Sequence, residues 1–387
     1  MLRNVEGMTT DTNLQPFEIH VPQAELDDLH ERLARTRWPH EVPGSGGRTD
    51  FTRGIPLTYL RELADDWRDR FDWRAQERSL NALGQVVTEI DGQRLHAVHQ
   101  PSSSPDALPL LLCHGWPGDP FEFAGIVEPL AETFNVVVPS LPGFGFSTPL
   151  SATGWEVSRT ADAYAELMTR LGYERFAVHG SDIGAGVAGR LAATHPDRVV
   201  GMHVASDGAA LSMAGETLPM PENLTDDERA QIEAVKDAGK EGRGYFELQN
   251  TKPDTLGPAL VDSPVGQLAW IAEKLQAWTH PSKELPDDAV GRDRLLTLVS
   301  IYWFTRAGHS SARFYYEASH AHLDWLTAPQ VPSGWAVFGT RPVARKVFDP
   351  WGTVTHWSEF EAGGHFPALE EPQLLVDDLK AFLGPLT

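Results

Sequence analysis

The chain has 387 residues, of which 41% are apolar, so it is long enough for a large core and for more than one domain. Its 32 lysines and arginines stand against 54 aspartates and glutamates, and the net charge of −22 excludes nucleic acid and anionic membranes as expected partners. The single cysteine, Cys113, excludes an internal disulfide. No apolar segment is long enough to span a bilayer and the first residues lack a signal region, so we expect a cytoplasmic protein.

The N-terminal part predicts helices followed by a hairpin. In PQAELDDLHERLARTRWP, Leu26, Leu29 and Leu33 recur at helical spacing, and Pro39 ends the pattern. The segment PLTYLRELADDWRDRF repeats this spacing. In GQVVTEIDGQRLHAVHQ, apolar and polar residues alternate on both sides of Asp91–Gly92, which indicates two strands joined by a tight turn.

From Pro109 onward, strand-like runs alternate with helix-like segments. The runs LPLLLCHG, FNVVVPSLPGFG, ERFAVHGS and DRVVGMHVAS predict buried strands. The segments PFEFAGIVEPLAE, TADAYAELMTRLG and GAGVAGRLAATHP predict helices between them. This alternation is typical of a doubly wound, mostly parallel α/β sheet, whose active sites lie at the carboxyl ends of the strands.

The alternation stops after about Gly208 and resumes with GWAVFG, TVTHWSEFEAGGHF and the helix PQLLVDDLKAFL. The intervening residues are mostly helical, which predicts a cap inserted into the sheet domain. Pockets often form where two such domains meet. We therefore predict five parts: a disordered tail at 1–16, a helical meander with a hairpin at 17–100, the first part of the core at 101–210, the helical cap at 211–327 and the second part of the core at 328–387.

The segment ERFAVHGSDIGAGVAGRLA carries the strongest chemical signal. Gly180 and Gly184 lie two residues before and after Asp182, between a predicted strand and a predicted helix, which is the pattern of a nucleophile elbow. A carboxylate in this place can displace a leaving group at saturated carbon and form an ester, which water then cleaves. That chemistry suits epoxides and alkyl halides. The alternative is that Asp182 only caps the following helix.

Two further motifs supply partners for this carboxylate. The HGWPG loop follows the first core strand, and we expect the backbone N–H groups of Trp116 and Ile183 to form an oxyanion hole. His114 and Trp116 of the same loop are candidates for substrate binding. His365 follows the last strand in a glycine-rich loop, and its place after the nucleophile in the chain fits a general base for water.

Together these segments resemble the microsomal-type epoxide hydrolase family from about Phe17 to the C-terminus. RLARTRWP resembles its meander, HGWPG its oxyanion loop, GSDIGAG its nucleophile turn and GGHFPALEEP its histidine loop. TKPDTLGPALVDSPVGQLAWIAEKLQAWT and SSARFYYE resemble its cap. The resemblance implies an α/β-hydrolase fold with an inserted helical cap, a small-molecule epoxide as substrate, no metal or organic cofactor, and a homodimer.

The family uses two cap tyrosines to hydrogen-bond the epoxide oxygen as it becomes an alkoxide. By motif position these are Tyr245 in GRGYFELQNTKP and Tyr315 in SARFYYE, with Tyr316 as the rival of Tyr315 and a further candidate for substrate binding. A phenol can donate a hydrogen bond or a proton to developing negative charge. Without the resemblance, these tyrosines could simply pack in the core.

One position departs from the family, which carries an acid after the penultimate strand to orient the histidine. Here Arg341 occupies roughly that position, and a cation cannot hold an imidazolium. Three acids could take its place. Asp207 is the first choice, because some relatives in this superfamily carry their acid after the corresponding strand. Asp349 lies in the segment after the penultimate strand, which is shorter than expected, and Glu359 lies on the last strand, where its side chain could point away. The alternative is that no acid is present, in which case Asp182 could still open or bind an epoxide but ester hydrolysis would be slow.

Four functions remain open. The first is hydrolysis of a bulky apolar or natural-product epoxide to a vicinal diol. The missing acid motivates the second, in which a nucleophile other than water opens the epoxide and forms a C–C or C–heteroatom bond in enediyne-type antibiotic biosynthesis. Haloalkane dehalogenases share the elbow but usually carry tryptophan after the nucleophile, where this chain has Ile183. A non-catalytic binder would have lost key groups, yet the candidate residues Asp182, His365, Tyr245 and Tyr315 all remain.

Overall fold

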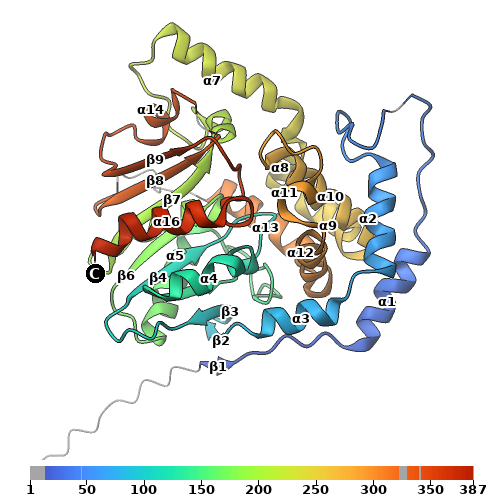
Figure 1. The fold of residues 1–387 in the computed structure, drawn as a ribbon, viewed down its shortest axis with the longest axis horizontal. Helices are drawn as coiled ribbons and strands as arrows, with labels where there is room; N and C mark the ends of the chain where they lie inside the picture. The colour runs from blue at the N-terminus through green and yellow to red at the C-terminus, as the bar shows by residue number, and fades with distance from the viewer. Residues whose placement is uncertain (1–13, 45, 322–328, 340, 387) are drawn as a thin grey trace, which may run out of the picture.

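The core of the protein is one mixed sheet. The computed structural model describes residues 14–386 except 45, 322–328 and 340. Within these residues, nine strands form a sheet in the order β1-β2-β3-β5-β4-β6-β7-β8-β9 (Figure 1). Neighbours are antiparallel from β1 to β5 and parallel from β5 onward. The strands are β1 Gln15–Pro16, β2 Gln85–Ile90, β3 Gln93–Gln100, β4 Leu108–Cys113, β5 Phe134–Pro139, β6 Phe176–Ser181, β7 Val199–Asp207, β8 Ser333–Phe338 and β9 His356–Phe360.

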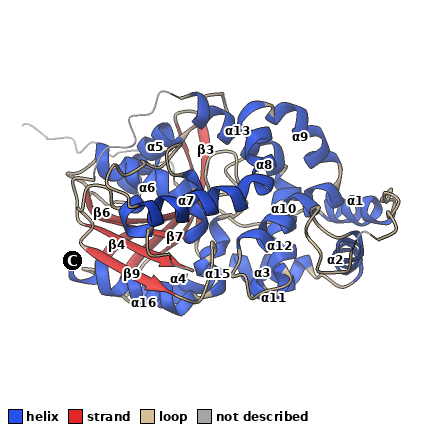
Figure 2. Ribbon diagram, turned by 90° about the horizontal axis from the view of Figure 1, so that it is seen from above, coloured by secondary structure: helices blue, strands red, loops and turns tan. Residues whose placement is uncertain are grey.

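Helices cover both faces of this sheet. Figure 2 shows α5 (Val157–Arg170) and α6 (Ile183–Thr194) on one face, and α4 (Ala124–Ala131) and α16 (Pro372–Leu383) on the other. Strands covered on both faces need apolar residues at consecutive positions rather than at alternate ones. β4 follows this rule, because its central leucines are all fully buried. The predicted doubly wound, mostly parallel fold is confirmed.

The hairpin predicted near the N-terminal end of the sheet is also present. β2 and β3 pair in antiparallel register and are joined at Asp91 and Gly92, which both adopt positive φ angles, as a two-residue type I′ turn requires. The prediction of a tail over residues 1–16 needs correction at its end, since Gln15 and Pro16 pair with β2. The rest of that predicted tail, residues 1–13, lies outside the described residues.

The chain leaves the sheet after β7 and returns to it at β8. Most of the helices between these strands form a block beside the sheet (Figure 1), and we call all the helices between β7 and β8 the cap. Its predicted end at residue 327 lies outside the described residues. No helix in the described part of the chain combines the length and apolarity needed to cross a bilayer. The cap helices are α7 Asp226–Gly239, α8 Gly244–Thr251, α9 Pro253–Asp262, α10 Pro264–Trp278, α11 Pro286–Val290, α12 Arg292–Thr305 and α13 Ala307–His320.

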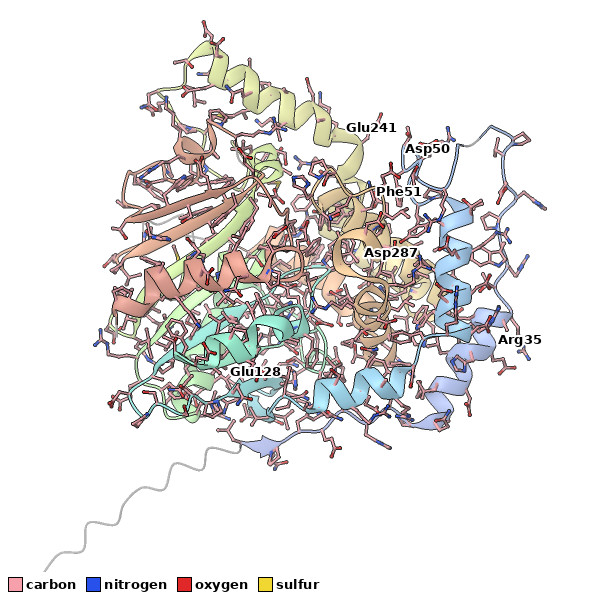
Figure 3. The ribbon with its side chains drawn as sticks, in the orientation of Figure 1. Arg35, Asp50, Phe51, Glu128, Glu241 and Asp287 are labelled. Carbon is pink, nitrogen blue, oxygen red and sulfur yellow. The ribbon has the colours of Figure 1, made fainter. Side chains whose placement is uncertain are left out.

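The N-terminal meander holds the cap from its outer side. It contains α1 (Gln23–Ala34), α2 (Leu57–Asp69) and α3 (Trp73–Asn81), and in Figure 1 α1 and α2 lie against the cap helices, away from the sheet. At this junction Arg292 contacts Glu62 of α2 at 2.9 Å and also contacts Asp287, which Figure 3 labels. The meander therefore fixes the cap through charged contacts as well as through apolar packing.

Two buried histidines on neighbouring strands of the sheet are hydrogen-bonded to each other. His203 on β7 donates from Nε2 to Asp378 of α16 at 2.8 Å, so its Nδ1 accepts the Nδ1–H of His179 on β6 at 2.9 Å. Burial lowers the pKa of His203, and Asp378 only partly opposes this effect. Burial also raises the pKa of Asp378, but hydrogen bonds from His203, Ser358 and His356 outweigh it and hold the pKa at about 2. The network is thus built for neutral histidines and an ionised carboxylate.

We expect Asp378→Asn to lower the free energy of unfolding at neutral pH by about 2 kcal/mol, because it removes charge-assisted hydrogen bonds inside the protein. The unmodified protein should lose stability as the pH falls below 6.5, since unfolded histidine binds a proton that folded His203 does not. The contribution of Asp378 is present above pH 3.8 and should be lost as the pH falls towards 2. Urea melts across this pH range measure both effects. Asp377→Asn, on the exposed side of the same helix, is the control, and an equal loss in both variants would contradict the prediction.

Candidate active site

The turn between β6 and α6 places Asp182 above the end of the sheet. Asp182 has φ 52° and ψ −126°, a strained conformation that is typical of a nucleophile elbow. The helix that follows can approach only because its neighbours are small: a Cβ on Gly180 would collide with the carbonyl of Gly184, and a Cβ on Gly184 with the carbonyl of Cys113. Asp182 precedes α6 but makes no side-chain cap of that helix, so the capping alternative is wrong.

The HGWPG loop brings a backbone donor to this carboxylate. The N–H of Trp116 donates to Asp182 Oδ1 at 2.9 Å. Gly115 makes this approach possible, because a Cβ there would collide with the Asp182 carboxylate. The Ile183 N–H also interacts with this carboxylate and favours its ionised form. The two predicted oxyanion donors therefore converge on one side chain.

His365 lies on the other side of the carboxylate. Its Nε2 is 3.4 Å from Asp182 Oδ2, without the alignment of a hydrogen bond, and its Nδ1 is 3.0 Å from Asp207 Oδ2. Asp207 also accepts the N–H groups of Ala209 and Ala210, which fix the carboxylate at the end of β7. About a fifth of each of the Asp182 and His365 side chains is accessible.

The other two candidate acids lie elsewhere. Asp349 accepts the backbone N–H of Thr353 in a turn of its own, and the exposed Glu359 accepts the indole N–H of Trp357. Arg341, at the position of the family's usual acid, has its side chain over Gly208. Of the three candidates, Asp207 alone contacts the imidazole of His365.

The electrostatics of Asp182 and His365 favour an ion pair. Burial raises the pKa of Asp182, but His365 and the two backbone donors outweigh burial and hold the pKa below its ordinary value. Burial lowers the pKa of His365, but contacts with Asp182 and Asp207 outweigh it and raise the pKa well above its ordinary value. Both shifts favour an ionised carboxylate beside a protonated imidazole.

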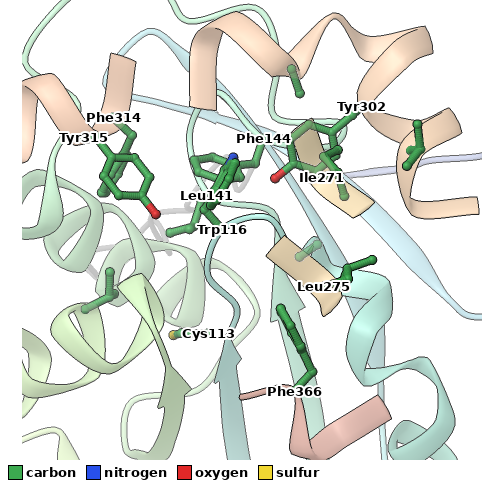
Figure 4. Packing of buried hydrophobic residues seen from close by; sticks show 14 of the residues in the cluster. Cys113, Trp116, Leu141, Phe144, Ile271, Leu275, Tyr302, Phe314, Tyr315 and Phe366 are labelled. Carbon is green, nitrogen blue, oxygen red and sulfur yellow. The ribbon is translucent and has the colours of Figure 1, made fainter. Parts of the chain in front are cut away.

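The cap delivers two phenols to the same place. Tyr245 stacks on Trp116 with ring centres 5.0 Å apart and ring planes 6° apart, and Tyr315 meets the edge of both rings. Figure 4 shows the Tyr315 hydroxyl pointing from α13 towards Trp116. Burial raises the pKa of both phenols, and the negative charge of Asp182 raises it further, so both remain protonated donors.

Two of the residues predicted to bind substrate do not face this site. The ring of His114 is fully buried: its Nε2 accepts the N–H of Leu141 at 3.0 Å, so its Nδ1–H donates to the carbonyl of Gly115. It shapes the loop rather than binding substrate. Tyr316 is 38% exposed and stacks on His320. Consecutive positions of a helix point about 100° apart, so Tyr316 points away from the site that its neighbour Tyr315 faces. The predictions for His114 and Tyr316 are therefore wrong.

Trp278 and Glu370 lie near His365 but were not predicted as site residues. The carbonyl of Trp278 accepts the N–H of His365 at 2.9 Å, and the two rings lie 5.0 Å apart. Glu370 accepts the N–H groups of Gly364, Phe366 and His280, and so closes the histidine loop. The only sequence signal for Glu370 was its place in GGHFPALEEP, five residues after the histidine.

Comparisons with known proteins identify the family of this chain. Residues 14–123 match the family described as "Epoxide hydrolase N terminus", and residues 109–291 match "alpha/beta hydrolase fold". A Stigmatella aurantiaca protein is 39% identical over 95% of this chain and 84% of its own length, and Epoxide hydrolase 1 of Sus scrofa is 33% identical over 97% and 90%. The solved structure of Aspergillus niger epoxide hydrolase superposes with a TM-score of 0.84 at 31% identity, with 96% of each chain covered. This chain is therefore an enzyme of the epoxide hydrolase family, built on the α/β-hydrolase fold.

Proposed function

We propose that the enzyme converts epoxides to vicinal diols through a covalent ester on Asp182. One observation carries this proposal: a single carboxylate lies between the N–H of Trp116 on Oδ1 and the imidazole of His365 near Oδ2, and Asp207 holds the far side of that imidazole. Each carboxylate oxygen thus has its own partner, which suits two successive steps.

In the first step the phenols of Tyr245 and Tyr315 hydrogen-bond the epoxide oxygen, and Asp182 Oδ2 attacks an epoxide carbon. The carbon–oxygen bond breaks, and the oxygen takes a proton from a phenol. The ester that forms keeps Oδ1 as its carbonyl oxygen, beside the N–H of Trp116. The donors are therefore already in place for the next step.

In the second step His365 removes a proton from water, which attacks the ester carbon. The negative charge then develops on Oδ1, where the N–H groups of Trp116 and Ile183 stabilise it. Ester formation removes the charge of Asp182, which is one of the causes that raise the pKa of His365. His365 can then release its proton to solvent, and the neutral imidazole acts as the base, while Asp207 keeps its orientation.

The same contacts also help to choose among the alternative functions that the sequence left open. The contact between Asp207 and His365 weakens the case for a nucleophile other than water, because that case arose from a missing acid. Ile183 after the nucleophile and two phenols over the carboxylate favour an oxygen leaving group over a halide. Trp116, Trp278 and the tyrosines give the site aromatic walls, so we propose a bulky apolar epoxide, such as a natural product, as substrate.

A single-turnover experiment in ¹⁸O-water with excess enzyme and styrene oxide tests the ester. The label should enter Asp182 and be absent from the first diol. Trypsin releases residues 176–190, in which Asp182 is the only acidic side chain, so mass spectrometry can locate the label without ambiguity. The peptide that contains Asp207 is the internal control. Label that goes directly into the diol would contradict the covalent route.

A further inference from the structure

Lys274 on α10 is a cation in the interior of the cap. The residue is 5% exposed. Its ammonium donates to the carbonyl of Gly242 at 3.0 Å and lies 2.9 Å from the carboxylate of Glu273, whose side chain is 27% exposed. A buried ammonium costs free energy unless it is well paired, and an apolar side chain of this length would pack at lower cost.

The ammonium lies over two aromatic rings of the active site. Its Nζ is 4.9 Å from the ring centre of Tyr245 and 5.9 Å from that of Trp278. Both distances are within the range in which a cation is attracted to a ring face. Tyr245 in turn stacks on Trp116, whose N–H holds Asp182. Lys274 thus contacts the ring of Tyr245 from α10.

This contact matters most when the phenol loses its proton. Burial raises the pKa of Tyr245, and the negative charges of Asp182, Asp207 and Glu273 raise it further. All of them make proton transfer from its hydroxyl harder, and Glu273 is also the carboxylate that pairs with Lys274. Arg243 lowers this pKa, but it also forms an ion pair with Glu216 at 2.6 Å. A phenolate spreads negative charge into its ring, so a cation over that ring stabilises the phenolate more than the phenol.

We propose that Lys274 is a positioning residue that makes Tyr245 a stronger proton donor to the epoxide oxygen; this inference rests on the proposed function. As the bond from Asp182 Oδ2 to carbon forms, the epoxide carbon–oxygen bond breaks, and its electron pair stays on oxygen. That oxygen takes the proton of Tyr245, and Lys274 stabilises the resulting phenolate. Ester hydrolysis releases one proton, which restores the phenol and balances the turnover.

Lys274→Gln tests this role, because glutamine can keep the hydrogen bond to the Gly242 carbonyl without the charge. In single turnovers with ring-substituted styrene oxides, ester formation should slow about five- to tenfold, and more for epoxides that give the more basic alkoxide. Ester hydrolysis should keep its rate. Lys274→Arg should restore ester formation to within about twofold, because it returns a cation. Lys252→Gln, an exposed lysine at the end of α8, is the matched control and should change neither step.

A double-variant cycle separates this role from simple packing. Combined with Tyr245→Phe, Lys274→Gln should slow ester formation no further, because the proton donor is already gone. Equal slowing of both half-reactions, or the same slowing in the Tyr245→Phe background, would overturn the proposal. If Lys274→Gln does not fold, Lys274→Met in the same cycle gives the same two outcomes. Absence of an ester in the unmodified enzyme would instead contradict the proposed function.

Discussion

Replacing His365 with glutamine should leave ester formation intact and slow ester hydrolysis by about 10³- to 10⁴-fold, so one covalent ester per chain should accumulate. The geometry separates the two steps. Asp182 Oδ2 attacks the epoxide without help from a base, whereas the water that cleaves the ester needs the Nε2 of His365, 3.4 Å from that oxygen. Glutamine occupies similar space but cannot take up a proton near neutral pH.

Intact-protein mass spectrometry after mixing with styrene oxide measures the trapped ester. His365→Gln combined with Asp182→Asn should show none, because no nucleophile remains. His195→Gln is a matched control at a partly exposed histidine, whose Nε2 lies 3.0 Å from Asp162 Oδ1. Release of diol from His365→Gln at the rate of the unmodified enzyme would show that the imidazole is not the base.

Asp207→Asn should slow ester hydrolysis by up to about 10⁴-fold, as loss of the orienting carboxylate does in related triads. The fold should survive, because the asparagine oxygen can still accept the N–H groups of Ala209 and Ala210, as Asp207 Oδ1 does now. Its amide group would face Nδ1 of His365 and favour the tautomer that carries the proton on Nε2. That tautomer cannot accept a proton from water.

Stopped single turnovers separate ester formation from hydrolysis in this variant, and only hydrolysis should change strongly. Asp349→Asn and Glu359→Gln are the informative controls, because both acids were candidates and neither contacts the imidazole. If either control loses hydrolysis while Asp207→Asn retains it, the assignment of the acid is wrong.

The pattern of the sequence was sufficient to predict the sheet and its helices, because each element satisfies a local rule. Strands buried on both faces need continuous apolar runs, and Asp91–Gly92 favours the two positive φ angles of its turn. The elbow was equally readable, because a sharp turn between strand and helix needs Gly180 and Gly184. Residue types that a turn or a reaction requires at fixed spacing can therefore be recognised from the sequence alone.

The errors arose where side-chain direction decides the outcome. Tyr315 and Tyr316 are neighbours in the same motif, but the helix turns one into the site and the other to the surface. His114 belongs to the loop that binds Asp182, yet its ring points into the core. The sequence could rank Asp207, Asp349 and Glu359 as candidate acids. It could not identify the acid that contacts His365, because that depends on how the ends of the strands lie in space. Lys274 showed no signal, since lysine on a helix is ordinarily solvated.

The location of Asp207 at the end of β7 has a consequence for how this enzyme can change. With Asp207 as the proposed acid, the connection from β8 to β9 has no assigned catalytic role, and its described part includes α14 (Ala344–Phe348), where Val347 is fully buried. We therefore expect that changes in the length of this connection leave ester hydrolysis intact, so a loop that is costly to alter when it carries the acid becomes a place where this chain can be redesigned.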